Sequence, residues 1–260
     1  MICLFRGVLV ACLCVLLASC AATTPTTTMS GGGQTPVDAQ GEVAGGGQPP
    51  TVSTVGATAS IAAEAARPAG IVTASMRELG ITGEAWASEG NPQAAVTVVE
   101  FSDYGCPFCG RYVSSTYPIL KKQFIDTGKI FYVFKDWPVV QLHLQAKLAA
   151  EAAECAGDQG KYWPMHDLLF ANQQSWDTTA AVATAAFARY AAQLGLERST
   201  FVRCTTGHMY AAEIEQDMAQ GDHVGTSGTP TFIINGKQLV GSQPAQAFIN
   251  AITNEMNHTP

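Results

Sequence analysis

The chain has 260 residues, of which 47% are hydrophobic and 13% charged, so it holds enough apolar material for a sizeable core in one or two domains. Its formal net charge is −7, and it contains no run of Lys or Arg. This composition argues against a nucleic-acid-binding protein, which would carry a basic patch, so we expect no nucleic-acid partner.

The N-terminal segment predicts export. The sequence "MICLFRG" precedes the apolar run "VLVACLCVLLAS", which is short for a membrane span but suits the core of a signal peptide. The run ends in "LASC", which resembles the lipobox of bacterial lipoproteins, where the cysteine is lipidated and becomes the first residue after cleavage. We expect a lipoprotein signal peptide over 1–19 and lipid at Cys20. The alternative is an ordinary signal peptide, or an uncleaved anchor with a chance cysteine.

Residues 20–74 are rich in Thr, Gly, Ala and Pro, with "SGGGQTP" and "GGGQPP" among them. Such a segment buries too little apolar surface to offset its chain entropy, so we expect a disordered tether between the lipid and a folded domain. A flexible coil of about 50 residues has an r.m.s. span of about 40 Å. Residues 75–94 are transitional and carry no firm pattern.

The folded part begins with a strand. "AVTVVEF" (95–101) is apolar and β-branched on both faces, as is typical of a central buried strand. A helix is expected over 106–126, because Pro107 suits a first helical turn, with a kink at Pro118. "GKIFYVFKD" (128–136) predicts a second strand, which completes a right-handed βαβ unit.

A helical section follows, which ends at a hairpin. Apolar residues recur at helical spacing on four segments, at Leu144, Leu148, Ala152 and Cys155, at Phe187, Tyr190 and Leu194, at Phe201 and Cys204, and at Ala211, Ile214 and Met218. "TFII-NG-KQLV" (231–240) predicts two strands joined by an Asn-Gly turn, and a last helix is expected over 244–256.

This order predicts an α/β protein with a thioredoxin fold and an inserted helical domain. The thioredoxin core is expected over 95–140 and 222–258, and the helical insert over 141–221.

Cys106 and Cys109 form a CPFC motif where the first strand meets the helix. A zinc site is disfavoured, because the other cysteines are isolated and the histidines are scattered, so we expect no metal and no other cofactor. A structural disulfide between residues three apart would constrain almost no chain. A redox-active pair fits best. At the helix N-terminus, free N–H groups and the helix dipole stabilise a Cys106 thiolate, whereas Cys109 should be more buried and stay protonated.

Cys155 and Cys204 complete an even set of four cysteines once the signal peptide is removed and Cys20 is lipidated. In an exported protein an even set predicts two disulfides. We therefore expect Cys155 and Cys204 to join two helices of the insert; two buried free thiols are the alternative.

The chain resembles the DsbA-like thiol–disulfide oxidoreductases, in the branch called thioredoxin-like four. The resemblance covers roughly 92–256 and rests on "VTVVEFSDYGCPFC", "FKDWPV", "AAECAGDQGKYWPMHDLLF" and "VGTSGTPTFIINGKQLVGSQP". It implies a cis peptide at Thr229-Pro230, in a loop that lies against the cysteines and pairs with substrate backbone. A trans proline that opens an edge strand is the alternative.

The resemblance also assigns roles to other residues. Glu100 matches an acidic position that exchanges a proton with Cys109 through water, with a solvated strand-end carboxylate as the alternative. Pro107 and Phe108 would contact substrate. Phe108 stands where the best-known members carry histidine, which predicts a weaker oxidant. Trp137 and Trp163 are expected to pack in the core and between the domains.

We therefore expect an exported, lipid-anchored, monomeric thiol oxidase that acts on exported proteins with free thiols. The resemblance implies reoxidation by a membrane quinone-linked partner. One alternative is a reductase or disulfide isomerase on the same fold. Another is a non-catalytic lipoprotein that holds peptides or a metal-delivery partner.

Overall fold

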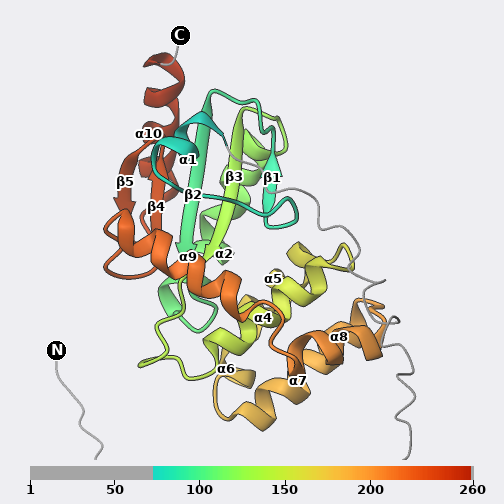
Figure 1. Ribbon diagram of the computed structural model, residues 1–260. Helices are drawn as coiled ribbons and strands as arrows, with labels where there is room; N and C mark the ends of the chain where they lie inside the picture. The colour runs from blue at the N-terminus through green and yellow to red at the C-terminus, as the bar shows by residue number, and fades with distance from the viewer. Residues whose placement is uncertain (1–72, 259–260) are drawn as a thin grey trace, which may run out of the picture. The chain divides into compact units, whose positions relative to one another are not determined.

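The computed structural model describes residues 73–258, and within that range one mixed sheet has the strand order β1-β3-β2-β4-β5 (Figure 1). Its strands are β1 (Ser88–Gly90), β2 (Val96–Ser102), β3 (Ile130–Asp136), β4 (Thr231–Ile234) and β5 (Lys237–Val240). β2 and β3 are parallel, and the other pairs are antiparallel. Every residue of β2, β3 and β4 is buried, which explains why their sequences lack the alternation of a half-exposed strand.

The helix after β2 is interrupted. α2 (Pro107–Ser115) ends at Thr116, and the chain continues as α3 (Tyr117–Leu120) and a π-helical turn, η1 (Lys121–Ile125). The break lies just ahead of Pro118, the residue at which the sequence predicts a kink, because proline has no N–H for the helical ladder.

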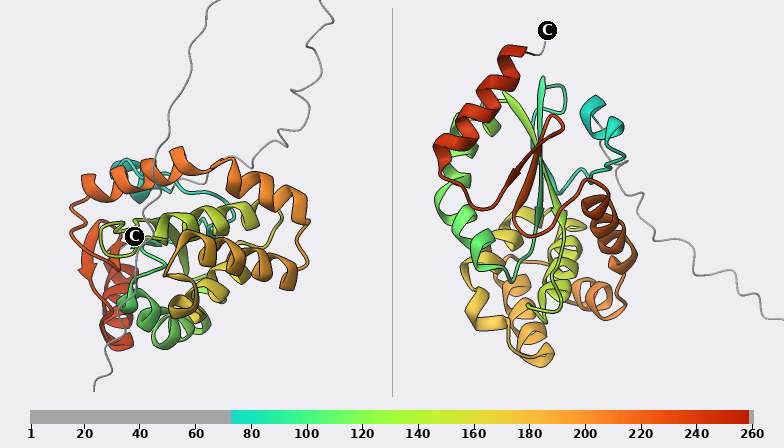
Figure 2. Two further views of the ribbon diagram at one scale, coloured as in Figure 1. Left: turned by 90° about the horizontal axis from the view of Figure 1, so that it is seen from below. Right: turned by 90° about the vertical axis from the view of Figure 1, so that its left-hand side faces the viewer.

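Helices cover both faces of the sheet (Figure 2). α2, α3 and α10 (Ala245–His258) lie on one face, where apolar side chains such as Leu120, Phe248 and Ile252 pack on β2 and β3. On the other face lie α1 (Ala74–Glu78) and α9 (Ala211–His223). α1 and β1 come from the segment without a firm sequence pattern, and β1 adds an antiparallel edge to β3.

Between β3 and β4 the chain forms a group of helices at one end of the sheet (Figure 1). They are α4 (Ala146–Gly157), α5 (Tyr162–Ala171), α6 (Gln173–Trp176), α7 (Ala180–Gln193) and α8 (Arg198–Thr206), followed by α9. α4 is almost wholly buried, since its many alanines let neighbouring helices pack closely around it. The predicted α/β thioredoxin fold with inserted helices is confirmed.

No helix within residues 73–258 has the length and apolar character needed to cross a membrane. The predicted signal peptide, Cys20 and nearly all of the tether lie outside the described residues.

Candidate active site

Cys106 and Cys109 lie at the N-terminus of α2, where the carboxyl end of the central strand β2 delivers the chain. Cys106 is the N-cap residue, and Pro107 occupies the first helical turn, where a missing N–H costs nothing. Both thiols are free and buried. Two thiols that can form a disulfide therefore lie one helical turn apart at the positive end of a helix.

The surroundings separate the acidities of the two thiols. A hydrogen bond with the Cys109 thiol, assisted by Thr229 and by the N–H groups of Cys109 and Phe108, outweighs burial and lowers the pKa of Cys106 from 9.0 to about 6. Burial, and the proximity of Cys106, raise the pKa of Cys109 well above its usual value. At neutral pH the reduced pair thus consists of a thiolate at Cys106 and a thiol at Cys109.

The loop before β4 lies against the pair. The Thr229-Pro230 peptide bond is cis, and the Cys106 sulfur lies 3.4 Å from the Thr229 carbonyl oxygen. β4 then pairs with β2, which holds this loop over the helix N-terminus. The structure therefore brings Thr229 and Pro230 to the cysteines.

Glu100 lies inside the sheet and not at a solvated strand end, because its exposed fraction is 1%. Its Oε2 accepts a hydrogen bond from the hydroxyl of Tyr132 on β3. Burial raises the pKa of Glu100 from 4.5 to about 7, against the opposing effect of the Tyr132 hydrogen bond. A carboxyl group with this pKa can gain or lose a proton near neutral pH.

Three residues that the sequence did not single out shape the turn before Cys106. Asp103 Oδ1 accepts the N–H of Gly105 at 2.7 Å, and its Oδ2 accepts the N–H of Val139 and contacts His143 Nδ1, each at 2.7 Å. Gln173, from α6, donates to two carbonyl groups of the same turn. Asp103 lies three residues before Cys106, so its position in the sequence could have marked it as a site residue. His143 and Gln173 are distant in sequence, and only the fold brings them to this turn.

Cys155 and Cys204 are bonded to each other and join α4 to α8, so they lie apart from the free pair. Trp163 stacks on Tyr117 with ring centroids 6.0 Å apart, which links the insert to the sheet domain. Trp137 Nε1 donates to Asp222 Oδ1 at 3.1 Å. Neither tryptophan touches the cysteines in these contacts.

A second group of buried charges pins α9 to β3. Lys135 on β3 pairs with Asp217 on α9, and with Glu84 at 3.3 Å. Asp217 Oδ2 also accepts the backbone N–H of Asp136 at 3.1 Å. Burial raises the pKa of Asp217 to about 7. Among residues 73–258, no group of three or more His, Cys, Asp or Glu side chains could hold a metal ion.

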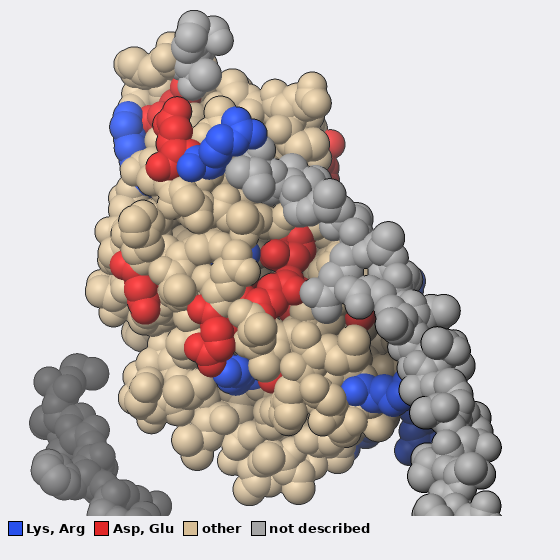
Figure 3. Space-filling model, in the orientation of Figure 1, with Lys and Arg blue, Asp and Glu red and all other residues tan. Residues whose placement is uncertain are grey.

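An exposed aromatic side chain and a cation lie next to the pair. Phe108 is 55% exposed, and the Arg111 guanidinium carbon lies 4.7 Å from the centre of its ring. Acidic side chains gather on the face that carries α9 (Figure 3).

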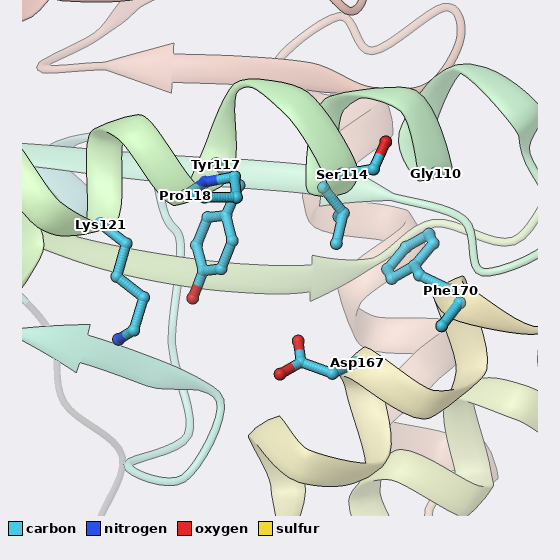
Figure 4. Close-up of a pocket in the computed structure, with 9 residues that line it drawn as sticks. Gly110, Ser114, Tyr117, Pro118, Lys121, Asp167 and Phe170 are labelled. Carbon is cyan, nitrogen blue, oxygen red and sulfur yellow. The ribbon is translucent and has the colours of Figure 1, made fainter.

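A pocket of about 350 Å³ extends from Gly110 between α2–α3 and α5. Tyr117 and Lys121 line it from one side and contact Glu89 of β1, while Asp167 and Phe170 line it from α5 (Figure 4). Gly110 and Ser114 of α2 and Tyr117 of α3 are among its lining residues.

Comparisons with known proteins agree with this arrangement. A family model described as thioredoxin matches residues 84–254. The Na(+)/H(+) antiporter NhaA 1 of Salinispora arenicola is 38% identical over 164 residues, which are 63% of this chain and 24% of that protein. Disulfide bond formation protein D of Bacillus subtilis is 31% identical over 157 residues, which are 58% of this chain and 68% of that protein.

A solved structure shows the same fold. The crystal structure of alpha-DsbA1 from Wolbachia pipientis superposes with a TM-score of 0.60 at 22% identity, and the match covers 66% of this chain and 92% of that one. The chain spans about a quarter of the length of the antiporter relatives it matches.

Proposed function

Because the chain belongs to the thioredoxin family, as a DsbA-like thiol–disulfide oxidoreductase, we propose that it oxidises pairs of substrate thiols to disulfides through Cys106 and Cys109. Its similarity to a protein named for disulfide bond formation supports the oxidising direction. The observation that carries the proposal is the divergence of the two thiol pKa values, one lowered to about 6 and the other raised.

The proposed reaction is a thiol–disulfide exchange between two substrate thiols and the Cys106–Cys109 disulfide. A substrate thiolate attacks Cys106 of the oxidised pair, which forms a mixed disulfide and releases Cys109 as a thiolate. A second substrate thiolate then attacks the substrate sulfur of the mixed disulfide, which forms the substrate disulfide and releases Cys106 as a thiolate. Two electrons pass from substrate to enzyme, and the leaving Cys109 takes up one proton.

Each step uses a feature of the site. Cys106 leaves readily because its thiolate is stabilised, and a low leaving-group pKa accelerates exchange. Because the pKa of Cys109 is high, its sulfur takes up a proton when it leaves the disulfide. We assign the delivery of this proton to Glu100, whose pKa of about 7 suits donation at neutral pH. We assign the cis-proline loop, with Pro107 and Phe108, to binding the substrate backbone beside Cys106.

We further propose that the protein works outside the cytoplasm, held to a membrane by lipid on Cys20. Support comes from the lipobox-like segment and from the Cys155–Cys204 disulfide, since disulfides persist in oxidising compartments. Exported proteins with free thiols are then its substrates, and a membrane quinone-linked protein is its reoxidation partner.

The reduction potential tests the direction of the reaction. We expect equilibration with glutathione to give a value near −180 mV, about that of protein disulfide isomerase and above the thioredoxin value of about −270 mV. The oxidised protein should also convert a synthetic peptide with two cysteines to its disulfide form, and Cys106→Ala should abolish this conversion. A potential at or below about −250 mV would instead favour the reductase alternative.

A further inference from the structure

The side chain of Gln173, from the helical insert, binds the backbone of the turn that carries Cys106. Gln173 Nε2 donates to the carbonyl oxygens of Tyr104 at 2.7 Å and of Cys106 at 2.9 Å. These two carbonyl groups belong to the Tyr104–Gly105 and Cys106–Pro107 peptide units, so a single amide holds the backbone just before and just after the Gly105–Cys106 peptide unit. Gln173 lies in α6 of the insert, 67 residues from Cys106 in sequence.

Three further hydrogen bonds of the turn are made with nearby residues of the sheet domain. The N–H of Cys106 donates to the Asp103 carbonyl oxygen at 3.0 Å, and the N–H of Gly105 donates to the Asp103 side chain. The carbonyl oxygen of Cys106 also accepts the N–H of Gly110 at 3.1 Å. Among these contacts, Gln173 binds the backbone carbonyl groups of the turn, whereas His143 contacts the Asp103 side chain.

The helix that follows is shaped to admit Gln173. A Cβ at Gly110 would lie 2.5 Å from Gln173 Oε1 and 3.1 Å from its Cδ, so any larger residue would displace the amide. Gly110 is an interior helix position with no positive φ, where glycine costs about 0.5–1 kcal/mol relative to alanine. The close approach of Gln173 is the structural reason for glycine here.

We propose that Gln173 is a positioning residue that sets the reactivity of Cys106 from the helical insert. The Gln173 amide donates to two carbonyl oxygens and so offsets their negative partial charge near the Cys106 sulfur. It also orients the turn so that the N–H groups at the start of α2 point at that sulfur. The inference deepens the proposed function, since it concerns the same pair, but it predicts a property of the reduced protein without substrate.

The test is a pH titration of the Cys106 thiolate by its absorbance near 240 nm in the reduced full-length protein. Gln173→Leu removes both donors at similar volume, and we expect it to raise the Cys106 pKa by about one unit, a tenfold change in the thiolate equilibrium. Gln173→Glu removes them and adds a negative charge, so its shift should be larger. Gln173→Lys can still donate to the carbonyl groups, so its titration should stay at or below the wild-type pKa.

Two further variants serve as controls. Gln174→Leu changes the neighbouring glutamine of the same helix and should leave the titration unchanged. Gly110→Ala should reproduce the shift of Gln173→Leu by displacing the amide, and the double variant should show no additional shift, since the two changes remove one interaction.

The outcomes are distinguishable. A wild-type titration in Gln173→Leu, with unfolding at the wild-type temperature, would overturn the inference and leave Gln173 as a packing residue. If Gln173→Leu is unstable, Gly110→Ala replaces it, and a Cys106 pKa that this substitution leaves unchanged would equally overturn the inference. If the pKa shifts as expected but the wild type does not oxidise the two-cysteine peptide, the positioning role stands and the proposed oxidase function fails.

Discussion

Glu100 Oε2 accepts the hydroxyl of Tyr132, while its Oε1 is buried without a hydrogen-bond partner among residues 73–258. Burial disfavours the charged form of this carboxyl group, because the protein interior solvates a charge less well than water does. The raised pKa of Glu100 follows from this position between the strands, and it makes this carboxyl group both a proton source and a pH-dependent term in stability.

Glu100→Gln should change how stability depends on pH. The folded-state pKa lies about 2.5 units above the unfolded value of 4.5, so the stabilisation from protonated Glu100, about 3 kcal/mol, is complete below pH 4.5 and lost as pH rises through about 7. Relative to wild type, the variant should therefore gain about 3 kcal/mol of unfolding free energy between pH 4 and pH 8. Urea unfolding at the two pH values measures it. Glu215→Gln, at an exposed carboxylate, is the control, and an equal response in both variants would contradict this account.

Cys109→Ala should raise the pKa of Cys106. The hydrogen bond with the Cys109 thiol is the largest cause of the lowered Cys106 pKa, so its loss moves the titration from about 6 toward 9.0. Absorbance near 240 nm against pH reports the thiolate directly, and Cys106→Ala provides the baseline. A titration of Cys109→Ala that stays near 6 would assign the effect to the helix N–H groups instead.

The sequence predicts much of the fold, because in these segments the local conformational preference of the residues agrees with the packing that the fold requires. β2 is apolar on both faces because both faces are covered, and Asn235 and Gly236 both adopt the positive φ that an Asn-Gly hairpin turn requires. The sequence does not predict β1, because three residues are too few to show a hydrophobic pattern. This edge strand forms through its pairing with β3.

The candidate site likewise contains residues that the sequence predicts and residues that only the fold reveals. Cys106, Pro107 and Cys109 form one contiguous motif, so their types and spacing suggest the chemistry. Tyr132 and Gln173 reach the site through strand pairing and helix packing, and tyrosine in a strand or glutamine in a helix is too common to mark a site.

Loss of the Cys155–Cys204 disulfide should destabilise the insert. The bond closes a loop with a sequence separation of 49, which corresponds to about 4 kcal/mol in the chain-entropy account. Replacing both cysteines by alanine should lower the free energy of unfolding by up to about that amount. Mass spectrometry of a non-reduced digest should show the peptides around the two residues linked. Separate peptides carrying alkylated thiols would contradict the pairing.

Cys20→Ser should release the protein from membranes, since serine cannot carry the thioether-linked lipid. Cell fractionation measures the distribution of the chain between membrane and soluble fractions. Cys14→Ser, within the apolar run, is the matched control and should leave membrane association unchanged. Tight membrane retention of Cys20→Ser would indicate an uncleaved apolar anchor.

Phe108→His should make the pair more oxidising. An imidazolium beside Cys106 stabilises its thiolate, so the reduction potential should rise from near −180 mV toward the value of about −120 mV known for DsbA, and the Cys106 pKa should fall with it. Arg111 limits the effect, because its guanidinium carbon lies 4.7 Å from the centre of the ring that histidine would replace, and one cation disfavours another. The double variant Phe108→His/Arg111→Ala should therefore have a higher potential than Phe108→His alone.

Equilibration with glutathione followed by thiol alkylation measures the potential, with Phe108→Leu as the uncharged control. If Phe108→His and Phe108→Leu give the same potential, the charge at this position does not control the redox poise.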